Sequence, residues 1–257
     1  MKLRSTSSSQ QLLFLAACGV SFFLNDASAQ TSAASIKQKN GTVQQGVITG
    51  VTASGVGVQL TGGANPGGTI SIPLAQIESI SMVPPPEYNL ALQAVAAKDL
   101  PKATGIIRGL ITKYKGLPAD WAQQAAALAG FLALQSGDMA GAEAAFSDFK
   151  KSYPTAPEGK VGSAAIAASK KDFATAKGLI APIVEDALKQ KDVPVTNRFA
   201  YSRAMYISGL VKESEKDLPG ALEDYLRTTT IFYHDTAAVA SAQERADALR
   251  KNKIAVP

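Results

Sequence analysis

A short pattern that recurs four times constrains the fold of this 257-residue chain more than any other feature of its sequence. Each copy consists of an Asp, a large apolar residue, a Pro or Ala, any residue, and then an Ala. An Asp side chain can accept hydrogen bonds from the backbone amides that the start of a helix leaves free. The sequence therefore predicts four turns that each lead into a helix. The copies are Asp99-Leu100-Pro101-Lys102-Ala103, Asp138-Met139-Ala140-Gly141-Ala142, Asp172-Phe173-Ala174-Thr175-Ala176 and Asp217-Leu218-Pro219-Gly220-Ala221.

The residues around each copy show a second regularity. The residue twelve positions before the last Ala is always small, and the residue four positions after it is always large. The distance between two packed helices depends on the side chains at their contact, so small residues let the helices approach closely. We therefore expect four units of two tightly packed helices. The small residues are Ala91, Gly130, Ala164 and Gly209, and the large ones are Ile107, Phe146, Ile180 and Tyr225.

This pattern resembles the tetratricopeptide repeat (TPR), a helix–turn–helix unit of about 34 residues whose signature contains Gly, then Ala and Phe four residues apart, then Pro. In the best-matched unit these residues are Gly130, Ala142, Phe146 and Pro154, whereas the early Trp and the Tyr of the family are absent from the matched positions. The resemblance implies an α-helical TPR-like solenoid, to which an irregular all-α bundle is the alternative. Its units fall near 84–117, 123–156, 157–190 and 202–235, followed by a polar capping helix at 237–251 and a tail at 252–257.

A different periodicity precedes the helical units. Between residues 36 and 83 apolar and polar residues alternate, as around Val56, Val58 and Leu60, which predicts about five short strands. Leu74-Ala75-Gln76-Ile77 is typical of a single helical turn before the last strand. The arrangement resembles the SH3-like or Sm-like small β-barrels. The expected fold is therefore α+β and multidomain, with a small all-β barrel at 36–83 followed by the α-helical TPR-like solenoid.

The N-terminal residues 1–29 have the pattern of a secretory signal peptide. Lys2 and Arg4 precede an apolar stretch from Leu12 to Leu24, and Ala27-Ser28-Ala29 offers small residues for cleavage. The apolar stretch is shorter than the roughly 20 residues that a membrane-spanning helix needs. Residues 30–35, small and polar, are expected to form a flexible lead-in. The protein is thus expected to be periplasmic or secreted.

Cys18, the single cysteine, leaves a second interpretation of the N-terminus open. Leu15-Ala16-Ala17-Cys18 resembles a bacterial lipobox, whose Cys becomes lipidated at a new N-terminus. Val20, Phe22 and Phe23 follow Cys18, however, where a lipoprotein normally has a polar tether. Cleavage after Ala29 is favoured, and a lipid anchor in the envelope at Cys18 is the alternative.

Few side chains are available for catalysis. The single histidine, His234, precedes Asp235, and such a pair can act as a general base with its orienting acid. Both residues fall at the end of the fourth unit, where a loop position is the simpler interpretation. The glycine-rich residues 62–68 lack the Gly-Lys-Ser/Thr ending of a phosphate loop. We therefore expect no catalytic residues, no cofactor and no metal site, and we do not expect an enzyme.

The TPR resemblance implies where a partner binds, because the first helices of the pairs line a concave groove in that family. An apolar groove can accept an amphipathic helix or an extended segment. The Lys, Arg and Asn residues with which some TPR proteins hold a terminal carboxylate are absent from the matched positions. The alternative is that the β domain or the capping helix covers these side chains. The matched groove positions are Tyr88, Leu92, Phe131, Leu134, Val161, Tyr206 and Leu210.

Together these features predict an exported, non-enzymatic scaffold or adaptor that binds other cell-envelope proteins through a TPR-like groove. The expected partner is a protein or peptide. Nucleic acid is not expected, because the net charge of +5 is mild and spread along the chain, and membrane contact requires a lipid on Cys18. Two alternatives stay open: a lipoprotein subunit of an outer-membrane assembly or export complex, and a cell-wall-modifying enzyme based on His234 and scattered acids.

Export with cleavage makes a prediction about the mature protein. Its intact mass should correspond to a chain that begins at Gln30, because Ala27-Ser28-Ala29 carries the cleavage signal. Mass spectrometry of the protein from its native envelope measures this directly. A diacylated species that begins at Cys18 would contradict the prediction and establish the lipoprotein alternative.

Overall fold

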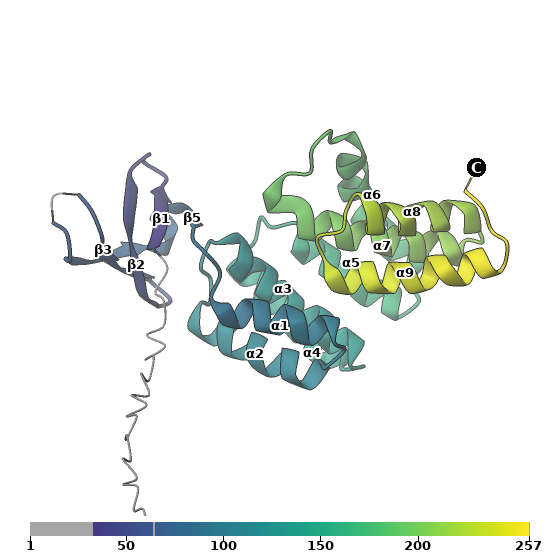
Figure 1. Cartoon of the computed structure of the whole chain (residues 1–257), viewed down its shortest axis with the longest axis horizontal. Coiled ribbons are helices and arrows are strands. Elements are labelled where there is room, and N and C mark those ends of the chain that lie inside the picture. The colour runs from purple at the N-terminus through teal and green to yellow at the C-terminus, as the bar shows by residue number, and fades with distance from the viewer. Residues whose placement is uncertain (1–32, 64, 257) are drawn as a thin grey trace, which may run out of the picture. The chain divides into compact units, whose positions relative to one another are not determined.

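The computed structural model describes residues 33–63 and 65–256 and shows an α+β chain, with an antiparallel sheet followed by helices (Figure 1). The predicted signal peptide, its cleavage site and Cys18 lie outside the described residues. Within the part of the chain that the structure describes, no helix is both long enough and apolar enough to cross a membrane.

Five antiparallel strands form one sheet in the order β4-β3-β2-β1-β5. Alternate side chains such as Ile36, Val56 and Val58 are fully buried, which is the reason for the apolar alternation in the sequence. The predicted helical turn is present as a short 3-10 helix, Leu74–Gln76, between β4 and β5. The strands are β1 Ala33–Gln38, β2 Val43–Val51, β3 Gly55–Leu60, β4 Thr69–Pro73 and β5 Ile77–Ser81.

Two expectations about this unit need correction. The barrel is not closed, because β4 pairs only with β3 and β5 only with β1, which leaves both as edge strands among the described residues. β4 is short and ends at Pro73, which has no N–H to donate to a further strand. The sheet also begins at Ala33, inside the segment expected to be a flexible lead-in, since Ala34 is fully buried.

The rest of the described chain is a helical region that resembles a repeat. Successive helices form four pairs, each helix packs on the next, and α5 also packs on both α3 and α7. The pairs are α1 Pro86–Ala96 with α2 Leu100–Lys113, α3 Asp120–Gln135 with α4 Met139–Ser152, α5 Glu158–Ser169 with α6 Phe173–Lys189, and α7 Arg198–Ser214 with α8 Leu218–Thr230. The final helix, α9 Thr236–Lys251, contacts α8, α7 and also α1.

All four predicted turns are present and share one geometry. The Asp of each copy is the N-cap of the second helix, and its carboxylate accepts a hydrogen bond from the amide three residues later, at 2.8–3.2 Å. The amide of the same Asp bonds back to a carbonyl five residues earlier, which closes the end of the first helix. One residue thus ends one helix and starts the next, so the turn is short and defined.

The residue before each Asp adopts positive φ. It is Gly137 in the second pair but Lys98, Lys171 and Lys216 in the others, with φ of 59°, 63° and 69°. Positive φ is the conformation in which glycine usually ends a helix. Three lysines adopt it here because the two flanking hydrogen-bonded helix ends fix the turn.

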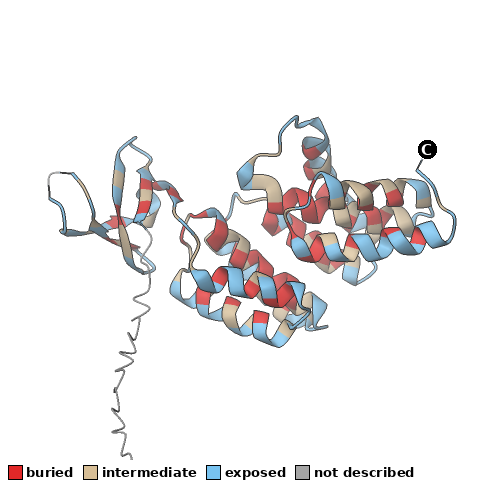
Figure 2. Cartoon of the chain, in the orientation of Figure 1, coloured by how far each residue is buried: buried red, intermediate tan, exposed pale blue. Residues whose placement is uncertain are grey.

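The small and large positions of the pattern are buried in every pair, and they pack on each other directly in the second and fourth pairs. The alanines at these positions are fully buried, and the four large side chains are at most 2% exposed. A Cβ atom added to Gly130 would lie 2.5 Å from the ring of Phe146, and one added to Gly209 would meet the ring of Tyr225. Figure 2 shows the buried positions as stripes along the helices. The close contact predicted between paired helices is therefore confirmed.

The contact at Gly130 can be tested by overpacking. We expect Gly130→Leu to reduce the free energy of unfolding by about 1–3 kcal/mol, because the new side chain has to displace the ring of Phe146. Gly105→Leu is the matched control, since Gly105 lies in α2 with open space where its Cβ would be. Urea unfolding of both variants measures the difference. Wild-type stability of Gly130→Leu would mean that this contact does not hold the pair together.

Candidate functional site

Four of the seven expected groove residues line one cavity. Phe131 and Leu134 from α3 and Tyr206 and Leu210 from α7 face a space of about 360 Å³. Ala165 and Ala168 of α5, the helix between them, keep this space open because their side chains are small. We call this space the groove cavity. Its outer wall includes Ser241 and Arg245 of α9.

The other three expected residues lie elsewhere. Val161 is fully buried in the core that α3 to α7 share. Leu92 is half-buried against the core of the first two pairs. Tyr88 is 6% exposed and its hydroxyl donates to Gln124 Oε1 at 2.9 Å. Burial, and secondly the charge of Asp235, raise the pKa of Tyr88 above its usual range.

Phe131 combines a place in the cavity wall with a place in the core. It is 3% exposed, and its ring packs edge-on against Phe146 at a centroid distance of 4.9 Å. The guanidinium carbon of Arg203 lies 4.1 Å from the ring centroid, a favourable cation–π distance. Phe131 is therefore held on several sides by its own chain.

Tyr206 is half-buried and more accessible. Its ring lies 6.0 Å from that of Tyr225, which is fully buried. The hydroxyl of Tyr225 donates to Glu213 at 2.7 Å, and burial followed by this carboxylate raises the pKa of Tyr225. Glu213 also accepts from Arg245 of α9 at 3.0 Å. A polar network thus supports the side of α7 that carries Tyr206.

Asp235 secures the start of α9. Its carboxylate accepts from the amides of Ala237 and Ala238, each at 3.0 Å, and its Oδ2 approaches Nη2 of Arg203 at 2.5 Å. Its own amide donates to the hydroxyl of Ser202, also on α7. Asp235 and Arg203 are 2% and 5% exposed, so this is a buried ion pair. It fixes α9 to α7 beside the groove cavity.

The arrangement around His234 differs from that of a general base with its acid. Among the described residues no hydrogen bond joins His234 to Asp235, whose carboxylate is occupied by Arg203 and the helix start. The imidazole instead stacks on Tyr233, with ring centroids 4.4 Å apart. Partial burial, and secondly Arg198, lower the pKa of His234. Asp235 therefore acts as a helix cap and ion-pair partner.

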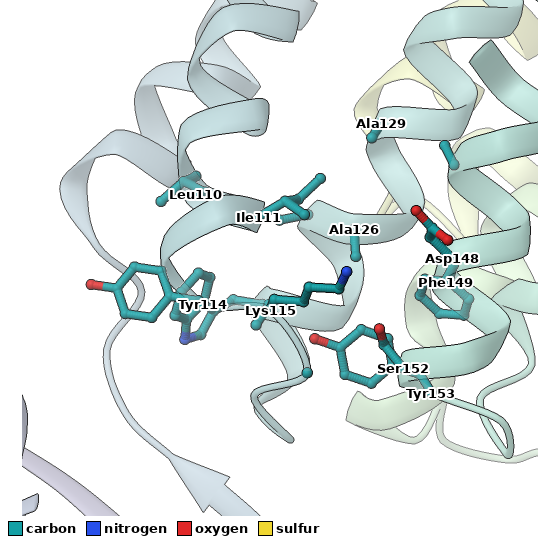
Figure 3. A pocket seen from close by; sticks show the side chains of 15 residues that line it. Leu110, Ile111, Tyr114, Lys115, Ala126, Ala129, Asp148, Phe149, Ser152 and Tyr153 are labelled. Atoms are coloured by element: carbon teal, nitrogen blue, oxygen red, sulfur yellow. The ribbon is translucent and has the colours of Figure 1, made fainter. Parts of the chain in front are cut away.

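A second cavity, of about 130 Å³, lies between α2, α3 and α4 (Figure 3). Its walls are mainly apolar, with Leu110 and Ile111 on one side and Phe149 and Tyr153 on the other. Burial raises the pKa of Tyr153 to about 12. The sequence signal for this cavity is a helical stripe of small residues on α3, and that pattern also predicts ordinary core packing. The small residues are Ala122, Ala125, Ala126 and Ala129.

The cations of the groove cavity were not expected from the sequence. Lys171, Arg203 and Arg245 line it, although none of them stands at a matched TPR groove position. Lys171 comes from a turn, and Arg245 is present only because α9 returns beside α7. A local pattern does not contain that long-range contact, so no sequence signal indicated these residues.

Comparison of the chain with protein-family models, with curated proteins and with solved structures finds no match. Across residues 33–63 and 65–256, no group of three or more His, Cys, Asp or Glu side chains is placed to hold a metal ion.

The buried ion pair predicts an unequal effect of two similar substitutions. Asp235→Asn should reduce the free energy of unfolding by about 3–5 kcal/mol, because it leaves the buried charge of Arg203 without a partner. Asp217→Asn, at an exposed N-cap, should cost less than about 1 kcal/mol, since Asn also caps well. Equal stability of the two variants in urea would show that the ion pair does not secure α9.

Proposed function

We propose that this protein is an exported, non-enzymatic scaffold or adaptor that binds another cell-envelope protein through a TPR-like groove. The observation that carries the proposal is the groove cavity, in which Phe131 and Leu134 of α3 and Tyr206 and Leu210 of α7 come together. A mainly apolar hollow with a few polar groups is the usual form of a binding site. The site residues we propose are those four, because Tyr88, Leu92 and Val161 do not line the groove cavity.

The proposal of a TPR-like solenoid is supported by the repetition inside the helical region. Four turns share the same Asp cap, and the same small and large positions are buried in each pair. The first helices of the last three pairs pack side by side, which is the arrangement that gives TPR proteins a continuous groove.

A peptide or an amphipathic helix suits the groove cavity better than a large flat surface would. The exposed parts of Leu134, Tyr206 and Leu210 come from two helices on either side of the small residues of α5. An apolar side chain from the partner can enter between them, as anchors do in helix-in-groove complexes. The envelope location in this proposal comes from the N-terminal sequence alone.

Two truncations test the groove. The partner is first isolated from native membranes with the mature protein as bait, and its affinity for each variant is then measured. Tyr206→Ala should weaken binding by about 2 kcal/mol or more with little change in melting temperature, because Tyr206 is half-buried at the cavity wall. Phe131→Ala should instead lower folding stability by about 3–5 kcal/mol, because Phe131 is core.

The two measurements separate the possible outcomes. If Tyr206→Ala folds normally and binds the partner as tightly as the wild type, the groove cavity is not the site. If Tyr206→Ala unfolds early, Tyr206 is part of the core, and binding has to be sought on the sheet or on the second helices of the pairs.

A further inference from the structure

We infer that the groove cavity selects a partner segment that carries an acidic side chain close to an apolar one. This inference rests on the proposed function, because it specifies the chemistry of the segment that the groove binds. It starts from the charges around the groove cavity and not from its apolar wall. Of the described residues that line the groove cavity, three are cationic and none is acidic.

Arg203 is the buried cation of the three. Its side chain is 6% exposed, and its Nε has no hydrogen-bond partner among the described residues. A guanidinium has five N–H donors, and Asp235 is the one acid paired with it here. Because Nε is buried, Arg203 contributes its charge to this part of the wall, partly balanced by Asp235, and not an accessible donor.

Lys171 is the one of the three cations whose charge is not balanced by an acidic partner among the described residues. It is exposed and takes part in no ion pair within the described residues, whereas Arg245 is paired with Glu213 at 3.0 Å. Positive φ at Lys171 is fixed by the turn between α5 and α6, so the backbone that carries this charge is well defined. Lys171 therefore supplies most of the positive charge that a partner would meet.

The apolar and cationic residues lie around one space. Phe173 and Leu210 are half-buried and line the groove cavity together with Lys171 and Arg245. A segment with Asp or Glu three or four residues from a large apolar residue places both side chains on one helical face. Such a segment can bury the apolar side chain and direct the carboxylate to Lys171.

A random peptide library tests the charge preference even while the natural partner is unidentified. The peptides are about twelve residues long, enough for three helical turns, and are displayed inside a coat protein so that no terminal carboxylate is free. The full chain, purified from cells that express it, is the target. Peptides that bind should be enriched in Asp or Glu within four residues of a large apolar residue.

One enriched peptide is then synthesised with blocked ends and its affinity is measured by calorimetry. Lys171→Gln should weaken binding about two- to fivefold, the size typical of an exposed ion pair. Lys216→Gln is the matched control, because Lys216 occupies the same turn position with φ of 69° and does not line the groove cavity. Replacing the acidic residue of the peptide by Gln should abolish the effect of Lys171→Gln.

The outcomes distinguish this inference from the proposed function. If the enriched peptides show no excess of acidic residues, or if Lys216→Gln weakens binding as much as Lys171→Gln, the inference is wrong. In that case a loss of affinity in Tyr206→Ala would still support the groove as the site. If Tyr206→Ala binds the peptides as well as the wild type, the groove itself is not the site, and both proposals fail.

Discussion

The helical part of this protein depends on a contact between a small residue on one helix and a large side chain on the next. At Gly130 the backbone of α3 lies against the ring of Phe146, and at Gly209 α7 lies against Tyr225 in the same way. The Asp-capped turn fixes the short connection between the two helices of each pair. Close pairs allow α3, α5 and α7 to pack side by side, and the groove cavity exists because of that alignment.

α9 adds polar groups to a groove cavity that α3, α5 and α7 otherwise build. Its Ser241 and Arg245 line the cavity, and Arg203 of α7 and Lys171 of the turn after α5 are the other two cations. Asp235 caps α9 and pairs with Arg203 of α7, and Arg245 of the same α9 lines the groove cavity. A buried ion pair often contributes little net stability, because both charges lose their hydration. Its effect here is to fix the position of α9 relative to α7.

The turns and helix ends could be predicted because their causes are local. Each Asp cap accepts a hydrogen bond from an amide three residues away. The contact of Gly130 with Phe146 joins two helices that are separated only by the short connection between α3 and α4. The open sheet could not be predicted, since its closure depends on whether β4 and β5 meet, which no nearby residue decides. The cations of the groove cavity could not be predicted either, because Arg245 reaches the cavity only through a long-range contact of α9. Positive φ at Lys171 was also missed, since that conformation usually selects glycine.

The apolar wall of the groove cavity and the exposed charge of Lys171 depend differently on salt. The apolar wall, with Tyr206 and Leu210 half-buried, contributes through removal of apolar surface from water, which does not depend on charge. Lys171 is exposed, so its attraction for a carboxylate is screened over about 10 Å at 0.1 M salt. Exposed charges of this kind influence the rate of association and the choice of partner more than the affinity. If the groove cavity binds a segment as proposed, its apolar wall should account for most of the affinity and Lys171 for much of the selectivity.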